Sequence, residues 1–291
     1  MIDQILIQAL SGVSRGMLLF VVAAGLTLIF GTMRIANFAH GSFYMLAAYV
    51  TYSVTQWVGN RNWGLALAIV VAPLVVAGFG ALIESQLLRR ISTRPHQYQL
   101  ILTYAVTLIV ADGIKLLWGR STYMVHRPDG LDGAVFVIDM PFPSYNLVLI
   151  IAGVLLAIVL HLMLTRTRFG KTVRAAVSDG EMTGALGIDV QRLFTRVFAL
   201  GAGLAGLGGA LAAPAGSVSL GLDSSIIIES FAVIIIGGVG SVMGALVGAL
   251  LIGVVHSVGI LFAPKLAIAF IFLVLCVVLV VRPQGLLGRA T

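Results

Sequence analysis

Nine apolar runs organise this chain, and short polar or glycine-containing connections separate them. A helix needs about 20 mostly apolar residues to cross a bilayer, and all but one run approach that length. The bilayer interior offers no water to backbone groups, so each run is expected to be helical. The runs are Ile5–Phe30, Ser42–Val58, Trp63–Leu88, Gln99–Trp118, Leu147–Leu164, Leu193–Leu211, Ser225–Ile236, Val242–Leu261 and Lys265–Val281.

Composition supports the same conclusion. Of the 291 residues, 59% are hydrophobic and 10% are charged, whereas soluble domains are about 25% charged. We therefore predict an all-α, polytopic integral membrane bundle of eight or nine segments that forms one domain over residues 1–291. The N-terminus lacks a separate cleavage pattern, and no cleaved signal peptide is expected.

The run Ser225–Ile236 is too short for an ordinary span and leads into the flexible GGVGS of Gly237–Ser241. It is predicted to be a half-helix or a re-entrant segment, which is tolerated where protein or water surrounds it. Small residues are dense in Gly201–Gly209 and Gly237–Gly253. This density predicts helices that pack at short distance.

Basic residues predict the orientation. If nine segments alternate, one side of the membrane receives twelve Lys and Arg residues and the other receives six. Because Lys and Arg concentrate on the cytoplasmic side, the richer side is expected to be cytoplasmic, with the N-terminus outside and the C-terminus inside. The net charge of +7 follows from this rule and does not require nucleic acid. The twelve are Arg34, Arg89, Arg90, Arg94, Arg166, Arg168, Lys171, Arg174, Arg192, Arg196, Arg282 and Arg289.

Two connections are long enough to have functions of their own. Residues 165–191 form a basic, helix-prone segment between two spans on the predicted cytoplasmic side. A segment of this kind is suited to contact a soluble partner. Residues 119–144 contain several Pro, Gly and Asp residues and form the main predicted external loop.

Polar residues inside the apolar runs are costly unless they face a cavity or a partner. Asn37 and His40 interrupt the first apolar stretch, and Gly31 and Gly41 flank them. Two interpretations stay open: a plain turn between spans, or a helix break that lines a passage. Glu229 has no basic neighbour in the sequence and is expected to need a partner from another segment.

Other charged residues have simpler interpretations. Asp112 and Lys115 are three positions apart, which predicts an intrahelical ion pair. Glu84 lies where Arg89 and Arg90 can reach it, so we expect it to be structural. No phosphate-binding G-x-x-x-x-G-K-[ST] motif, metal-ligand spacing or catalytic cluster is present. The chain is therefore not expected to be an enzyme or to hold a cofactor or metal.

Four blocks of sequence resemble the permease subunit of bacterial branched-chain amino-acid ABC importers, the H-type member of a permease pair. They extend over almost the whole chain, in the order and at the spacing of that family. Two departures occur in the loop: Met182 and Thr183 replace the alanines of E-A-A-x-x-x-G, and no I-x-L-P follows. The blocks are Gly25–Tyr49, with A-N-F-A-H-G at Ala36–Gly41, then Arg174–Val190, Glu229–Gly253 and V-R-P-Q-G-L-L-G at Val281–Gly288.

The resemblance implies an inner-membrane transport subunit that works with an M-type second permease subunit, ATPase subunits and a periplasmic substrate-binding protein. ATP hydrolysis would occur on the ATPase subunits. Segment 165–191 would then be the coupling loop that docks on the ATPase. Its implied coupling residues are Arg174, Asp179, Glu181, Gly187, Ile188 and Asp189, and the implied pathway residues are Asn37, His40, Gly41 and Glu229.

Gly187 is expected to adopt a left-handed conformation, since it follows the short helix predicted in the loop. Alternative functions also stay open. An importer of urea or short amides would share this architecture. An ion-coupled transporter acting alone would use Asp112 and Glu229 as charged residues within the membrane.

Overall fold

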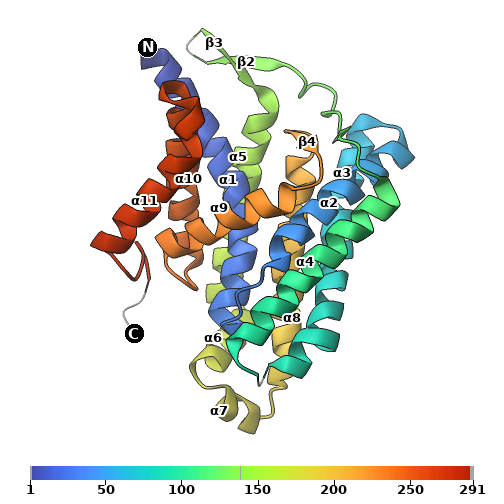
Figure 1. The fold of residues 1–291 in the computed structure, drawn as a ribbon, viewed down its shortest axis with the longest axis vertical. Coiled ribbons are helices and arrows are strands. Elements are labelled where there is room, and N and C mark those ends of the chain that lie inside the picture. The colour runs from blue at the N-terminus through green and yellow to red at the C-terminus, as the bar shows by residue number, and fades with distance from the viewer. Residues whose placement is uncertain (1, 93, 138, 289–291) are drawn as a thin grey trace.

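The computed structural model describes residues 2–92, 94–137 and 139–288, so Arg289 lies outside the described residues. All nine apolar runs are helical within this part of the chain. The predicted all-α membrane bundle is therefore confirmed (Figure 1). The α-helices are α1 (Ile2–Met33), α2 (Ala39–Val58), α3 (Arg61–Ile83), α4 (His96–Trp118), α5 (Ser144–Arg166), α6 (Arg168–Ser178), α7 (Gly180–Ala185), α8 (Val190–Ala212), α9 (Leu222–Gly237), α10 (Val242–Phe262) and α11 (Ala267–Val281).

Within the described residues, seven helical segments are long and apolar enough to cross a membrane. Helices α2 and α9 occupy the two remaining runs but do not meet that standard. Helix α2 has 20 residues and is less apolar, whereas α9 has only 16. At 1.5 Å per residue α9 is about 24 Å long, less than the roughly 30 Å hydrocarbon core. Figure 1 shows that it runs obliquely across the middle of the bundle.

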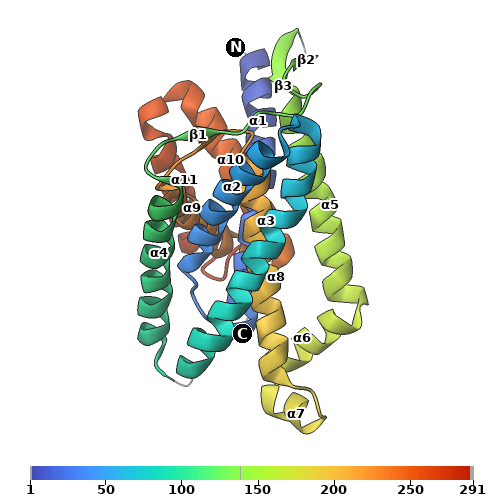
Figure 2. The same cartoon turned by 90° about the vertical axis from the view of Figure 1, so that its right-hand side faces the viewer.

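Helix α1 runs through the middle of the bundle (Figure 2). An 18-residue apolar window of α1 is 72% buried, against 22% for α4 and for α5 and 17% for the helix ending at Val281. The outer helices therefore leave apolar side chains such as Ile109, Leu116 and Val280 exposed. An apolar exterior of this kind suits lipid or another membrane subunit.

Glycines allow the inner helices to approach closely, as predicted. A Cβ added at Gly16 would lie 2.8 Å from the carbonyl oxygen of Ala249, and one at Gly206 would lie 2.9 Å from the Cα of Pro73. Both distances are too short for a real Cβ contact. The glycine-rich sequence of α8 and α10 thus sets the backbone separation in the core.

The two ends of the bundle carry different elements (Figures 1 and 2). Helices α6 and α7 lie at one end, together with the connection between α3 and α4. That connection begins with a π-helical turn, Glu84–Leu88, and a 3-10 turn, Arg89–Ile91. The N-terminus and the hairpin of β2 (Ala134–Val137) and β3 (Met140–Pro143) lie at the opposite end.

The loop 119–144 is more ordered than its sequence suggested. Besides the β2–β3 hairpin it contains β1 (Tyr123–Met124), which pairs antiparallel with β4 (Ser217–Val218). The β1–β4 pair ties this loop to the segment after α8.

The C-terminal carbonyls of α9 are satisfied by residues much later in the chain. The backbone amide of Leu286 donates to the carbonyl oxygen of Ile236 at 2.8 Å, and that of Leu287 donates to Gly237 at 3.0 Å. The last carbonyls of a helix have no partner inside the helix. The segment after α11 therefore caps a helix that ends within the bundle, where unpaired carbonyls are costly.

Candidate functional site

Segment 165–191 folds as two short helices because side-chain caps start each one. The Thr167 hydroxyl accepts a hydrogen bond from the amide of Gly170 at 3.2 Å and begins α6. The Asp179 carboxylate accepts from Met182 at 2.9 Å and begins α7. Thr and Asp are favoured at these positions because their oxygens satisfy unpaired amides of the first turn.

The start of α8 is fixed in the same way. Asp189 accepts a hydrogen bond from the amide of Arg192 at 2.9 Å and also pairs with its guanidinium at 2.9 Å. Gly187 has φ +85°, which confirms its predicted left-handed conformation. This residue reverses the chain between α7 and α8, and Ile188 beside it is half-buried.

The remaining predicted coupling residues lie apart from one another. The guanidinium of Arg174 donates to the carbonyl oxygen of Leu164 and so ties α6 to the end of α5. Glu181 lies exposed in the first turn of α7 and makes no ion pair with any described residue. Ile188 and Asp189 therefore lie side by side at the start of α8, whereas Arg174 and Glu181 form no ion pair with each other.

The tip of this segment exposes apolar side chains at the far end of the bundle. Met182 and Leu186 on α7 are 60% and 75% exposed. Beside them, between α6 and α8, lies a cleft of about 410 Å³. Three arginines and three apolar side chains make up most of its walls, together with one threonine and one aspartate: Arg168, Arg192, Arg196, Phe169, Ile188, Leu193, Thr172 and Asp189. An apolar tip beside a basic cleft is a surface suited to a protein partner that carries acidic groups.

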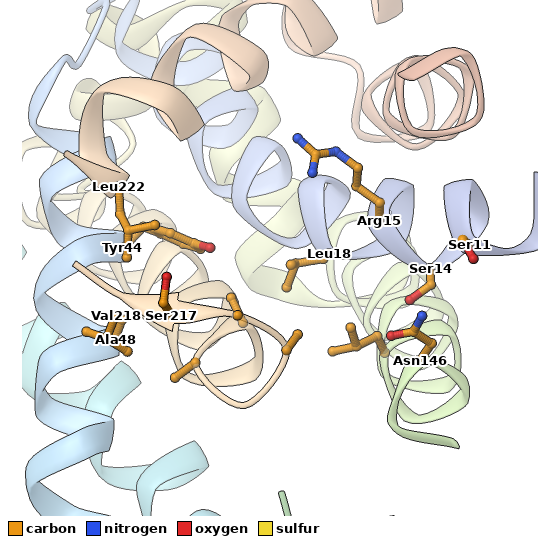
Figure 3. A pocket seen from close by; sticks show the side chains of 15 residues that line it. Ser11, Ser14, Arg15, Leu18, Tyr44, Ala48, Asn146, Ser217, Val218 and Leu222 are labelled. Atoms are coloured by element: carbon orange, nitrogen blue, oxygen red, sulfur yellow. The ribbon is translucent and has the colours of Figure 1, made fainter. Parts of the chain in front are cut away.

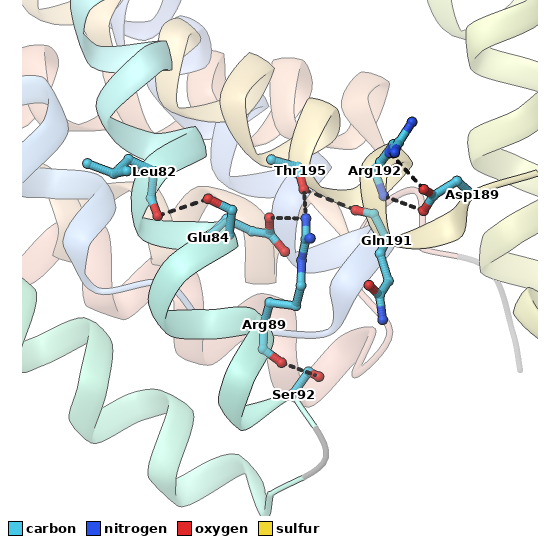
Figure 4. A network of polar contacts seen from close by, with 9 residues as sticks. Leu82, Glu84, Arg89, Ser92, Asp189, Gln191, Arg192 and Thr195 are labelled. Carbon is cyan, nitrogen blue, oxygen red and sulfur yellow. Dashed lines mark hydrogen bonds and ion pairs between the residues drawn. The ribbon is translucent and has the colours of Figure 1, made fainter.

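A buried ion pair joins this region to α3 (Figure 4). Arg89 Nη2 lies 3.4 Å from Glu84 Oε2 and donates to the hydroxyl of Thr195 on α8 at 2.5 Å. The Glu84 side chain is only 3% exposed, whereas that of Arg89 is 32% exposed. The predicted contact of Glu84 with Arg89 is confirmed. Because the guanidinium contacts both Glu84 in the π-helical turn after α3 and Thr195 on α8, the base of α8 is held to the end of α3.

A second cavity, of about 330 Å³, lies toward the end that carries the N-terminus (Figure 3). It is enclosed by α1, α2, α5, the segment from α8 to β4, and the start of α9. Hydroxyl and amide groups from Ser11, Ser14, Asn146 and Ser217 line part of it. Leu18, Leu149, Val218 and Leu222 form an apolar part.

Arg15 lies at the edge of this cavity and pairs with Glu229 of α9. Arg15 Nη2 and Glu229 Oε1 are 2.6 Å apart, and their side chains are 40% and 17% exposed. The expectation that Glu229 needs a partner from another segment is confirmed. Arg15 was not among the site residues predicted from the sequence. Its position near the middle of an apolar helix was the available signal.

The other predicted pathway residues are buried between helices. Asn37 and His40 have no exposed surface. His40 Nε2 lies 2.9 Å from the carbonyl oxygen of Val22, and Asn37 Oδ1 accepts from the amide of Ala39 at 3.1 Å. Gly41 packs against the backbone of Asp223 at the start of α9. These three residues hold the break between α1 and α2, and none of them is among the residues that line the cavity beside Arg15.

Comparison with known proteins agrees with this architecture. Residues 8–280 match the family model described as "Branched-chain amino acid transport system / permease component". The chain is 27% identical over 296 residues to the high-affinity branched-chain amino acid transport system permease protein LivH of Escherichia coli (strain K12). That alignment covers 97% of this chain and 95% of the relative.

Two further relatives extend the comparison. The permease protein BraD of Pseudomonas aeruginosa is 27% identical over 299 residues, with 97% of this chain and 95% of the relative covered. A probable branched-chain amino acid transport permease protein of Methanocaldococcus jannaschii is 30% identical over 250 residues, with 82% and 76% covered. No solved structure matches this chain.

Proposed function

We propose, since this chain belongs to the family of branched-chain amino acid transport system permease components, that it is a membrane subunit of an ATP-driven importer of branched-chain amino acids. The observation that carries the ATP-driven mechanism is the capped α6–α7 segment with its exposed tip. A membrane bundle that ends in a rigid apolar tip beside a basic cleft has a surface for a soluble partner. The similarity to permeases named for branched-chain amino acid transport supports the choice of cargo.

In this proposal α7 docks on an ATPase subunit. Met182 and Leu186 supply the apolar contact, and Glu181 offers an exposed carboxylate at the same tip. Asp179, Gly187 and the Ile188–Asp189 pair fix the shape of the tip through two helix caps and one left-handed turn. Arg174 ties the segment to α5, so that movement of the tip reaches the membrane helices.

The α7 end then faces the cytoplasm, and the N-terminus faces outward across the inner membrane. The excess of basic residues in the α3–α4 connection and in α6 supports this orientation. The loop 119–144 would meet the periplasmic substrate-binding protein. The exposed apolar sides of α4 and α11 are available to lipid and to a second permease subunit.

The translocation pathway would run beside α9. Glu229 lies on its wall near the outward cavity. Asn37, His40 and Gly41 would support the pathway from behind, because they hold the helix break against α1 and α9.

Reconstitution tests this proposal. The chain is expected to co-purify with a permease partner and ATPase subunits, and the complex in vesicles is expected to accumulate labelled leucine with the binding protein and ATP. Orthovanadate should stop uptake, whereas proton and sodium ionophores should not. Uptake that needs no ATP and collapses with an ionophore would instead identify an ion-coupled transporter.

The coupling role has its own variant. Glu181→Lys should leave the complex assembled but abolish the ATP hydrolysis that the loaded binding protein stimulates. Lys171→Glu is a matched control, because it changes an exposed charge on α6 outside the α7 tip. Normal stimulation in Glu181→Lys would contradict docking through this part of α7.

A further inference from the structure

The ion pair between Arg15 and Glu229 is unusual in its setting. Arg15 lies on α1, where the residues beside it in the sequence are mostly apolar or small. Its partner Glu229 lies on α9, which is too short to span the membrane. Charges at such depth are expensive and generally belong to a ligand path or a structural pair. Arg15, the arginine of the pair, also lines a cavity of about 330 Å³, which is large enough for a small solute.

The pairing uses little of the binding capacity of the guanidinium. One nitrogen, Nη2, donates to one carboxylate oxygen at 2.6 Å. The Nε of Arg15 is buried and has no hydrogen-bond partner among the described residues. A guanidinium offers five N–H donors in a planar fork that matches a carboxylate, and here the fork is only partly used. An unused buried donor next to a cavity leaves room for a ligand oxygen.

The cavity beside the pair has both polar and apolar walls. Figure 3 shows the guanidinium of Arg15 at one edge, with Leu18 between it and Ser217. Ser14 and Asn146 lie on another side of the same cavity. Leu149 and Leu222 add aliphatic surface. Hydrogen-bonding groups, an apolar wall and Arg15 of the ion pair therefore line the same cavity.

From this arrangement we infer that Arg15 and Glu229 bind the carboxylate and the ammonium group of a free α-amino acid whose aliphatic side chain enters the cavity. A zwitterion would replace one internal ion pair with two ion pairs and leave no unbalanced charge. A solute with a single charge would leave either Glu229 or Arg15 without a partner, which is unfavourable inside a membrane protein. This inference rests on the proposed function and names the chain's own contacts with the cargo.

Binding of leucine to the purified complex in nanodiscs, without the binding protein, tests the inference by saturation-transfer NMR. Leucine is expected to bind, while 4-methylpentanoate and 3-methylbutylamine, which keep one charged group each, should bind far more weakly. Arg15→Gln should weaken leucine binding by roughly ten- to hundredfold, as expected for a lost charge-assisted contact. Arg61→Gln, an exposed arginine paired with Asp129 and Asp132, is the control and should bind like wild type.

Two further variants separate recognition from structure. Arg15→Lys keeps a positive charge opposite Glu229 but lacks the planar fork, so the complex should assemble and bind leucine several-fold more weakly. The exchange Arg15→Glu with Glu229→Arg keeps an ion pair but reverses it, and leucine uptake should stay low. Uptake restored by the exchange would show that the pair is structural only.

The outcomes also distinguish this inference from the proposed function. Wild-type leucine affinity in Arg15→Gln or Arg15→Lys, or equal binding of 4-methylpentanoate, would overturn the inference while ATP-driven uptake could stand. A wild-type complex that shows no ATP-driven uptake would refute the proposed function, and the NMR comparison would still measure the site.

Discussion

Replacing Arg89 by glutamine should destabilise the protein strongly, because it removes the ion-pair partner of Glu84. The Glu84 side chain is 3% exposed and lies 3.4 Å from the guanidinium. Removing one member of a buried pair costs about 3–5 kcal/mol. The Arg89 side chain is 32% exposed, so water can replace part of the lost interaction, and we expect a loss of about 2–3 kcal/mol.

The double variant Glu84→Gln with Arg89→Gln should recover most of that loss. With both charges removed, no buried charge lacks a partner, and the remaining cost is about 1 kcal/mol for the altered hydrogen bonds, including the one to Thr195. Adding Glu84→Gln to Arg89→Gln is therefore expected to restore about 1–2 kcal/mol of stability. If the stability loss in Arg89→Gln comes from leaving Glu84 without its partner, the double variant must be more stable than Arg89→Gln.

Equilibrium unfolding in mixed micelles of SDS and a mild detergent, followed by circular dichroism, measures these free energies. Arg90→Gln is the control. It removes the neighbouring exposed arginine, which reaches only the side chain of Gln86, and should change stability by less than about 0.5 kcal/mol. The reasoning is refuted if Arg89→Gln is as stable as this control, or if the double variant is no more stable than Arg89→Gln.

Further variants test packing, coupling and orientation. Gly16→Val should prevent folding or assembly because its Cβ would meet the backbone of α10, while Gly78→Val, with open space around its Cα, should express at the wild-type level in membranes. Gly187→Val should cost about 1–2 kcal/mol for its positive φ and should abolish stimulated ATP hydrolysis in an assembled complex; an unchanged ATPase rate in vesicles would exclude this residue from coupling. In a background without the native cysteine, a cysteine at Ser178 should react only with reagents inside the cell and one at Gly130 with reagents outside, and reversed labelling would overturn the proposed orientation.

The elements that could be predicted are those set by local sequence. Run length marked the helices and singled out Ser225–Ile236 as short, and a glycine after a short helix indicated the left-handed turn at Gly187. Both depend on neighbouring residues only. The spacing of Asp112 and Lys115 likewise predicted their ion pair, which is present at 2.7 Å.

The features that could not be predicted depend on residues distant in the chain. Arg15 and Glu229 are 214 positions apart, and no local pattern indicates which arginine reaches the carboxylate. The β1–β4 pair joins Tyr123 to Val218, so this structure in the loop 119–144 comes from tertiary contact. Asn37 and His40 were recognisable as polar exceptions, but their complete burial follows from how α1, α2 and α9 pack together.

The cap on α9 has a consequence for biosynthesis. The carbonyl oxygen of Ile236 accepts a hydrogen bond from the amide of Leu286, which comes fifty positions later in the chain. Helices α10 and α11 are synthesised between these two residues. At about 5–20 residues per second, the ribosome needs roughly 3–10 s to supply the cap. During that interval the end of α9 has neither its final hydrogen bonds nor the glycine contacts between Gly238 and Gly285. The C-terminal end of α9 is therefore capped only after the two following helices have been made, so this part of the bundle is completed late in synthesis.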